Sequence, residues 1–230
     1  MNRFPFPTKN ELWTSFLVYY VISRFVYIIT NMSYLDILGY FFILSILGLC
    51  LYIYISRDDF QLKCIISGVD GNKYCVRERN KIQEAVDLLA KTTTKCKELV
   101  AYVSDKYPDK ENVKRLVKNF NPQKVMETLP TSTYTAFSEN KGEKIAFCLN
   151  VKKEGNIENL IDEHTLTFVA IHEIAHTMTK SIGHKSEFWE NFKFLLKEAK
   201  ESKIHEPVDY SKTPEEYCSM KITDNPYFSI

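Results

Sequence analysis

The sequence predicts an α+β domain that follows an N-terminal membrane segment. Three patterns support this class: an uncharged apolar run at 37–55, strand-like segments at 60–78 and 133–151, and helical apolar spacing around them. Strands, helix, strands and then two helices follow one another without regular alternation, which is typical of α+β rather than α/β proteins. Hydrophobic residues at 45% and charged residues at 26% are typical of a globular chain.

We expect two parts, a membrane anchor at 1–58 and a globular domain at 59–230. The run "ILGYFFILSILGLCLYIYI" at 37–55 contains no charged residue. At about 1.5 Å per residue, a helix of this length crosses most of a hydrocarbon core of about 30 Å. A buried core helix is the alternative, but the run has no polar face of the kind that such a helix usually carries.

A second apolar stretch at 12–30 contains Arg24. An arginine in the middle of a span disfavours insertion by about 2.5–3.5 kcal/mol, which the other side chains can offset. Residues 12–30 therefore form either a second span, in a hairpin with 37–55, or an interfacial helix, and the hairpin is favoured. A cleaved signal peptide is not expected, because no A-x-A-like site follows the apolar run. The lipid bilayer is thus an expected partner of 12–55.

The charge balance does not indicate nucleic acid as a partner. The net charge is +1, and residues 1–56 hold three of the 30 basic and two of the 29 acidic residues, so the remainder is formally neutral. Basic runs such as "KTTTKCK" and "KENVKRLVK" leave a local contact open, although such runs more often form the solvated face of a helix.

Six cysteines are present, and no pair has the CxxC spacing of a cysteine-built zinc finger. We expect the five that follow residue 56 to be free thiols in a reducing compartment. This expectation favours the cytosolic side of the membrane for the domain.

The first part of the domain predicts a hairpin and a long helix. Two short strands are expected within 60–78, around the turn at Asp70-Gly71. A helix then begins at a cap formed by Asn80 and continues to about Asp105.

The middle of the domain predicts shorter elements. Apolar residues at spacings of three and four indicate a short helix over 113–120, and Asn121-Pro122 begins a further helical turn. Residues 133–151 predict a β-hairpin around "ENKG", because apolar residues alternate cleanly after that turn.

The stretch "VAIHEIAHTMTKSIGHKSEFW" at 169–189 holds three of the five histidines. A helix over 165–182 places His172 and His176 on one face, one turn apart. Glu173 is rotated from His172 by about 100° and lies beside an ion held by that face. This arrangement is H-E-x-x-H, in which two histidines bind zinc and the glutamate is the general base.

A catalytic zinc site needs a third protein ligand and keeps an open position for water. His184 follows His176 by eight residues, so on an unbroken helix it would lie about 12 Å farther along. The chain must therefore turn back, and Gly183 favours a turn at that place. We expect a new helix after His184. The alternative of Glu187 or Glu190 as third ligand stays open.

The motif "HEIAH…GHKSEFW" resembles the zinc-site signature of the WLM and SprT-like metallopeptidases, and "ENKGEKIAFCL" is similar to the strand before the WLM helix. The resemblance is specific over about 139–200 and weaker over 60–230. It is strongest to the WLM-type metallopeptidases of large DNA viruses, some of which have an N-terminal anchor. Eight residues separate the last two histidines, more than in cellular WLM proteins and fewer than in many SprT-like ones, and no DNA-binding zinc ribbon or ubiquitin-type reader follows residue 200.

The resemblance implies a minimal zincin-like fold, in which a small sheet accompanies the active-site helix and the sheet edge binds a peptide as an added strand. It also implies that His172, His176 and His184 are the zinc ligands and that Glu173 is the catalytic base. The implied activity is hydrolysis of a protein or peptide by a zinc endopeptidase. The implied location is a membrane, of a host or of a virion if the chain is viral.

Three points stay open at this level. The oxyanion-stabilising donor is one of several candidates, namely Tyr134, Tyr210 and Tyr217. A zinc-binding membrane scaffold is an alternative function, and it would require a fourth protein ligand such as Cys218 or His205. A protease acting on nucleic-acid-bound proteins is the other alternative.

Overall fold

The computed structural model divides the chain into two compact units, 1–57 and 58–230. The predicted second span at 12–30 lies mostly outside the described residues. The structure describes residues 33–56, 62–129, 131–152 and 158–228, together with Tyr19, Tyr20, Ser23, Arg24 and Tyr27.

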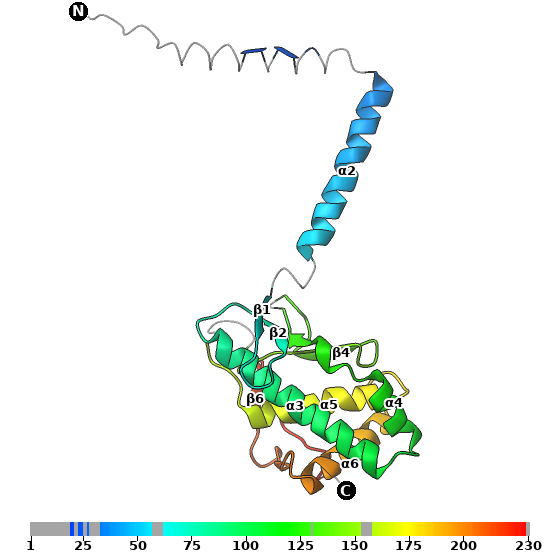
Figure 1. The fold of residues 1–230 in the computed structure, drawn as a ribbon, viewed down its shortest axis with the longest axis vertical. Coiled ribbons are helices and arrows are strands. Elements are labelled where there is room, and N and C mark those ends of the chain that lie inside the picture. The colour runs from blue at the N-terminus through cyan, green and yellow to red at the C-terminus, as the bar shows by residue number, and fades with distance from the viewer. Residues whose placement is uncertain are drawn as a thin grey trace, which may run out of the picture. The chain divides into compact units, whose positions relative to one another are not determined.

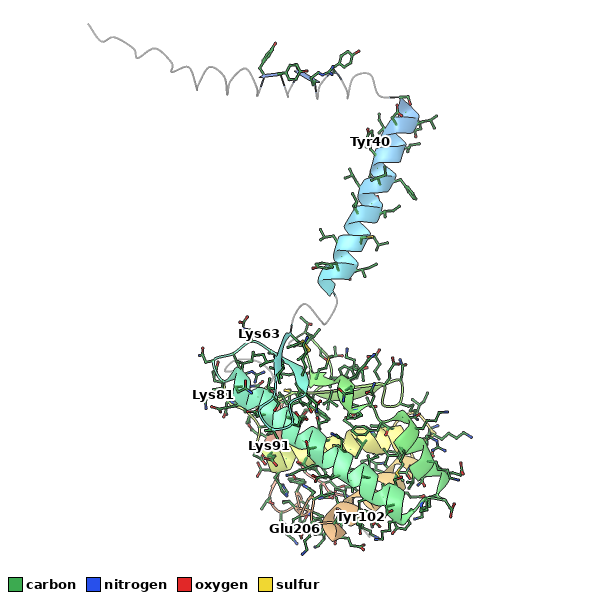
Figure 2. The ribbon with its side chains drawn as sticks, in the orientation of Figure 1. Tyr40, Lys63, Lys81, Lys91, Tyr102 and Glu206 are labelled. Atoms are coloured by element: carbon green, nitrogen blue, oxygen red, sulfur yellow. A yellow bond between two sulfur atoms is a disulfide. The ribbon has the colours of Figure 1, made fainter. Side chains whose placement is uncertain are left out.

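Helix α2 (Tyr34–Ser56) contains the predicted apolar run, and its 23 residues reach about 35 Å at 1.5 Å per residue. Its side chains project around the whole circumference, Tyr40 among them (Figure 2). The backbone N–H of Ser33 donates to Asp36 Oδ2 (3.0 Å), and the N–H of Asp36 donates to Ser33 Oγ (3.3 Å). Within the part of the chain that is described, α2 is the one helix long and apolar enough to cross a membrane.

The second unit contains a mixed sheet in the order β1-β2-β3-β5-β4. The pairs β1/β2 and β4/β5 are antiparallel hairpins, as the sequence predicts, and β3 joins them by pairing in parallel with β2 and β5. Strand β3 is not predicted from the sequence, because its three residues are too few for an alternating pattern. The strands are β1 (Lys63–Ile66), β2 (Lys73–Val76), β3 (Val125–Glu127), β4 (Ala136–Glu139) and β5 (Lys144–Phe147).

The unit combines this sheet with four helices, of which α3 and α5 contact the strands, so the coarse α+β prediction is confirmed. Helix α5 contacts α3, α4 and α6 as well as β4, which makes it the central helix (Figure 1). Twelve of its 16 residues are buried, and this explains its broad apolar surface. The helices are α3 (Ile82–Lys106), α4 (Glu111–Asn119), α5 (Glu163–Met178) and α6 (Ser186–Glu201), with a short 3-10 helix η2 (Pro122–Lys124) at the predicted Asn-Pro turn.

The predicted cap of α3 is wrong. The helix begins after Lys81, and no side chain of its own segment caps it. The carboxylate of Glu158 instead accepts hydrogen bonds from the backbone N–H of Asn80 (2.9 Å) and of Lys81 (3.1 Å). A distant acidic residue therefore satisfies the exposed amides, which local sequence patterns cannot reveal.

The predicted end of α5 is also wrong. The helix ends at Met178, and Ile182, which we expected in the apolar stripe, is 83% exposed. The hydroxyl of Thr179 donates to the carbonyl of Ala175 (2.7 Å), so the last turn is closed by a side chain. The turn that we expected at Gly183 is present, with φ of +77° at this residue. The segment 179–185 is thus a loop, and α6 follows it as predicted.

The prediction of free thiols is wrong for four cysteines, because Cys64 is bonded to Cys75 and Cys148 to Cys218. Cys96 is a buried free thiol. Disulfides persist mainly in oxidising compartments, so the thiol argument for the cytosolic side no longer holds.

The second disulfide attaches a C-terminal hairpin to the end of the sheet. This hairpin pairs β6 (Glu215–Tyr217) with β7 (Met220–Ile222). Two backbone hydrogen bonds accompany the disulfide, from Cys218 N–H to Asn150 O (3.1 Å) and from Ser219 N–H to Val151 O (2.9 Å). The hairpin is therefore fixed beside the strand that leads toward α5.

Candidate metal centre

Three histidine side chains converge on one point. His184 Nε2 lies 3.1 Å from His176 Nε2 and 3.1 Å from His172 Nε2. One ligand nitrogen of each ring lies within 4.8 Å of the others. Nitrogens bound to a tetrahedral zinc at about 2.05 Å would lie about 3.3 Å apart. The spacing and the all-imidazole donor set therefore fit a zinc ion.

The three ligand candidates come from two segments. His172 and His176 lie one turn apart on α5, and His184 lies on the loop between α5 and α6. The helix begins at a true cap, because the Asp162 side chain accepts a hydrogen bond from the backbone N–H of Thr165 (2.8 Å). The structure thus brings together all three histidines that the sequence motif singled out.

An aromatic side chain from α6 supports the three imidazoles. Phe188 is fully buried and stacks on His176, with ring centroids 4.2 Å apart and an interplanar angle of 27°. Its ring also contacts His172 edge-on at 4.8 Å and His184 at 4.6 Å. One residue of the following helix therefore restricts the orientation of every imidazole in the cluster.

The electrostatics favour neutral imidazoles. Burial, followed by the neighbouring His176 and His184, lowers the pKa of His172 to about 3. Burial lowers the pKa of His176 to about 4, with His184 contributing next. Neutral imidazole is the form that binds a metal, so these two rings are ready as ligands at neutral pH without losing a proton.

Glu173 lies beside the histidines and lines the same cleft. It is 5% exposed, and burial raises the pKa of its carboxyl group to about 8. A carboxyl group with a pKa near neutrality can both accept and return a proton at physiological pH.

The alternative third ligands do not join the cluster. Among the described residues, the group of side chains that could hold an ion consists of three histidines and includes neither Glu187 nor Glu190. The carboxylate of Glu187 instead accepts hydrogen bonds from the backbone N–H groups of Lys180 and Ser181, each at 2.9 Å.

Cys218 and His205, the candidates for the fourth ligand of a structural zinc site, also lie outside the histidine cluster. The sulfur of Cys218 is bonded to Cys148. The ring of His205 stacks on His164, with centroids 4.2 Å apart, outside the histidine cluster. The described part of the chain thus leaves a coordination position without a protein ligand.

The cluster opens into a cleft of about 1230 Å³. One wall is β4 with the segment 131–135 before it, and β4 is an edge strand in the order of the described strands. The loop 182–184 forms a second wall, and strand β7 of the C-terminal hairpin forms a third. Most of the lining is apolar, with space for several residues of an extended chain.

Two of the three tyrosines that the sequence offers as candidate oxyanion donors line the cleft. Tyr134 and Tyr217 line the cleft, whereas Tyr210 lies in the core with its ring 4.9 Å from that of Phe168. Tyr134 is 66% exposed, and Tyr217 is buried with its hydroxyl donating to the carbonyl of Thr135 (3.2 Å).

Sequence reasoning missed a buried charge cluster at the cleft. Glu127, at the end of β3, lines the cleft and is paired with Arg79, and its carboxylate accepts the backbone N–H of Arg77 (2.7 Å). Burial raises the pKa of Glu127 and lowers that of Arg77. In the sequence these positions read Arg77-Glu78-Arg79, three consecutive charged residues without apolar alternation, so no local signal could have shown that the two arginines are buried.

Comparison with known proteins gives two viral relatives. The chain is 27% identical over 163 residues to an uncharacterized protein of Acanthamoeba polyphaga mimivirus, covering 69% of this chain and 81% of that protein. It is 41% identical over 64 residues to an uncharacterized protein of Invertebrate iridescent virus 6, covering 28% of this chain and 35% of that protein. No family model matches the chain, and no solved structure matches it. The chain is therefore similar to proteins encoded by these two viruses.

Proposed function

We propose that this chain is a membrane-anchored zinc endopeptidase with a WLM/SprT-like active site. One observation carries the proposal: the Nε2 atoms of His172, His176 and His184 converge while Glu173 lies beside them in an open cleft. The missing fourth protein ligand supports a catalytic site rather than a structural one.

The roles of the residues follow from their chemistry. His172, His176 and His184 would hold zinc, which when bound supplies a Lewis acid and lowers the pKa of water. Glu173 takes a proton from the attacking water and returns it to the leaving amine, a role that its place beside the histidines in the cleft allows. The largely apolar lining would remove water from around a bound peptide and strengthen these interactions.

The substrate class is a protein or peptide in extended conformation. The edge strand β4 forms one wall of the cleft, and a peptide can pair with such an edge as an added strand. The alternative of a protease for nucleic-acid-bound proteins gains no support from the run "KTTTKCK", because Lys91 and Lys95 pair with Glu163 (3.7 and 2.6 Å).

The anchor role of α2 rests on its length and its uniformly apolar surface. The two relatives support a viral origin, and hence a host or virion membrane as the site of action. The two disulfides favour the oxidising side of that membrane over the cytosolic side for the peptidase domain.

Metal analysis combined with a cleavage assay tests the proposal on the full chain in detergent micelles. We expect one zinc per chain in the wild type, loss of zinc in His184→Ala, and retention in His164→Ala, which changes a histidine of α5 that lies outside the cluster. Glu173→Gln should keep zinc and lower the rate of peptide cleavage by about 10²–10⁴-fold. A wild-type chain without zinc, or a Glu173→Gln variant that cleaves at the wild-type rate, would refute the proposal.

A further inference from the structure

The third ligand candidate is the one that does not lie on a helix. His184 lies on the loop 179–185, which has no regular hydrogen-bonding pattern and is exposed over most of its length. Surface loops are usually more mobile than the elements they connect. A metal site that includes a loop residue therefore needs contacts that fix the loop backbone.

At the start of this loop, side chains bind both the carbonyl and the N–H groups of the backbone. The ammonium group of Lys141 donates to the carbonyls of Thr179 (3.1 Å) and Ser181 (2.6 Å). The carboxylate of Glu187 accepts from the N–H groups of Lys180 and Ser181, each at 2.9 Å. Because of these four hydrogen bonds, residues 179–181 are held from the β4–β5 turn and from α6 at once.

The end of the loop is fixed separately. The indole N–H of Trp189 donates to the carbonyl of His184 itself (3.1 Å), and the two rings lie with centroids 5.7 Å apart. The amide of Asn191 donates to the hydroxyl of Thr179 (2.9 Å). Among these hydrogen bonds to the loop, those of Lys141 come from the side of the sheet, and the others come from side chains of α6.

The backbone of Lys141 lies in the left-handed region, which is unfavourable for a residue other than glycine. Its φ is +61°, between Asn140 at +47° and Gly142 at +113°. The left-handed region disfavours a non-glycine residue, whereas glycine would adopt it without strain. A lysine at this position indicates that its side chain makes an interaction that offsets the strain.

We propose that Lys141 is a positioning residue for the His184 loop. It holds carbonyl groups of the loop while Glu187 holds N–H groups, and it thereby sets the affinity of the site for zinc. The proposal rests on the proposed function, since it assigns His184 to the metal. It goes beyond that function by adding a residue about 40 positions upstream of the histidine that it positions.

The sign of the effect separates this role from a simple effect of charge. A positive charge near the cluster opposes the binding of a cation, so removing it should strengthen zinc binding if charge alone mattered. If Lys141 acts by holding the loop, its removal should weaken zinc binding. Loss of groups that orient metal ligands typically lowers metal affinity by about 10–100-fold.

The test uses the full chain in detergent micelles and compares Lys141→Met with Lys124→Met. Lys124 serves as the control because it is an exposed lysine near the same turn whose described partner is Glu143 (3.9 Å) rather than the loop 179–185. Zinc affinity is measured by competition with a chelator. We expect the dissociation constant to rise by about 10–100-fold in Lys141→Met and to stay within about twofold in Lys124→Met. An unchanged or lower dissociation constant in Lys141→Met would overturn the proposal.

A glycine variant separates positioning from stability. Lys141→Gly relieves the left-handed strain, so its metal-free form should unfold at a temperature no lower than that of Lys141→Met, while its zinc affinity falls to the same extent. Lys141→Arg keeps donors and charge and should recover part of the affinity. A glycine variant with wild-type affinity would show that the side chain does not position His184.

Hydrogen exchange of the metal-free protein distinguishes failure of this proposal from failure of the proposed function. The amides of Lys180 and Ser181 should exchange about tenfold faster in Lys141→Met than in the wild type or in Lys124→Met. Unchanged exchange would overturn the positioning role whether or not zinc binds. Faster exchange in a chain that binds no zinc would retain the loop contact and reject the metal site instead.

Discussion

Removing the disulfide between Cys148 and Cys218 should destabilise the protein more than removing the one between Cys64 and Cys75. The bonded cysteines are separated by 70 residues in the first pair and by 11 in the second. The chain-entropy relation for closing such loops gives about 4.4 kcal/mol and about 2.8 kcal/mol at 25 °C. We therefore expect a difference of about 1.6 kcal/mol in the free energy of unfolding.

The assay is denaturant-induced unfolding of the full chain in detergent micelles. Double alanine variants of each pair are compared with the wild type, and the wild type is also measured with a reductant. Equal losses in the two variants, or no loss in either, would refute the assumption that these bridges act by restricting the unfolded chain. Reduction of the wild type should lower its stability at least as far as the Cys148/Cys218 variant does.

The same variants carry a functional expectation. Tyr217 and Met220 line the cleft on either side of the bonded Cys218. The Cys148/Cys218 variant should therefore lose cleavage activity under conditions where it is still folded. The Cys64/Cys75 variant should not, because that bridge joins β1 to β2 outside the residues that line the cleft. Comparable activity in both variants would contradict a role of this hairpin as a cleft wall.

Three further predictions follow from the described contacts. His205 has no hydrogen-bond partner on either ring nitrogen within the described structure, and burial lowers its pKa to about 3 from a reference of 6.5. The unfolded chain therefore binds the proton first, and stability falls as the pH drops below about 6.5. Between pH 7.5 and 5 this loss is about 2 kcal/mol, which His205→Leu should remove in denaturant titrations at the two pH values. Asp162→Ala removes the cap of α5 and should lower the free energy of unfolding by about 1 kcal/mol, measured in the same way. Gly142→Ala should lower it by more than about 2 kcal/mol, because a Cβ atom at φ +113° would lie 2.6 Å from Thr177 Cγ2 and 2.8 Å from the carbonyl of Asn119. A thermal melt within about 2 °C of the wild type would contradict this last prediction.

The sequence could predict features that depend on local periodicity. The helical repeat alone places His172 and His176 together with Glu173 beside them, and turn residues predict both antiparallel hairpins, with alternation as added support for the second. The position of His184 was foreseen only as a need for the chain to turn back. The backbone of its loop is bound by Lys141, from about 40 positions upstream, and no local pattern reveals that contact.

Two of the failed predictions, the cap of α3 and the free thiols, share a physical cause, which is satisfaction of backbone or sulfur groups by distant partners. The amides at the start of α3 bind Glu158 rather than a local cap. The thiol of Cys148 meets that of Cys218 only because the C-terminal hairpin returns to the sheet. Spacing in the sequence contains no information about either contact, so these could be learned only from the three-dimensional arrangement.

The attachment of the hairpin has a consequence for the order of events during biosynthesis. The ribosome makes α2 first, the histidines and the glutamate later, and the residues of the third cleft wall after those. Domains generally fold as the chain emerges, from the N-terminal side onward. If α2 anchors the chain as proposed, the nascent chain is tethered well before the cleft has all its walls, and oxidation of Cys148 with Cys218 is among the last steps. If the proposed activity is correct, a newly made molecule reaches its membrane as an incomplete enzyme, and neighbouring proteins at the site of synthesis are protected until maturation is finished.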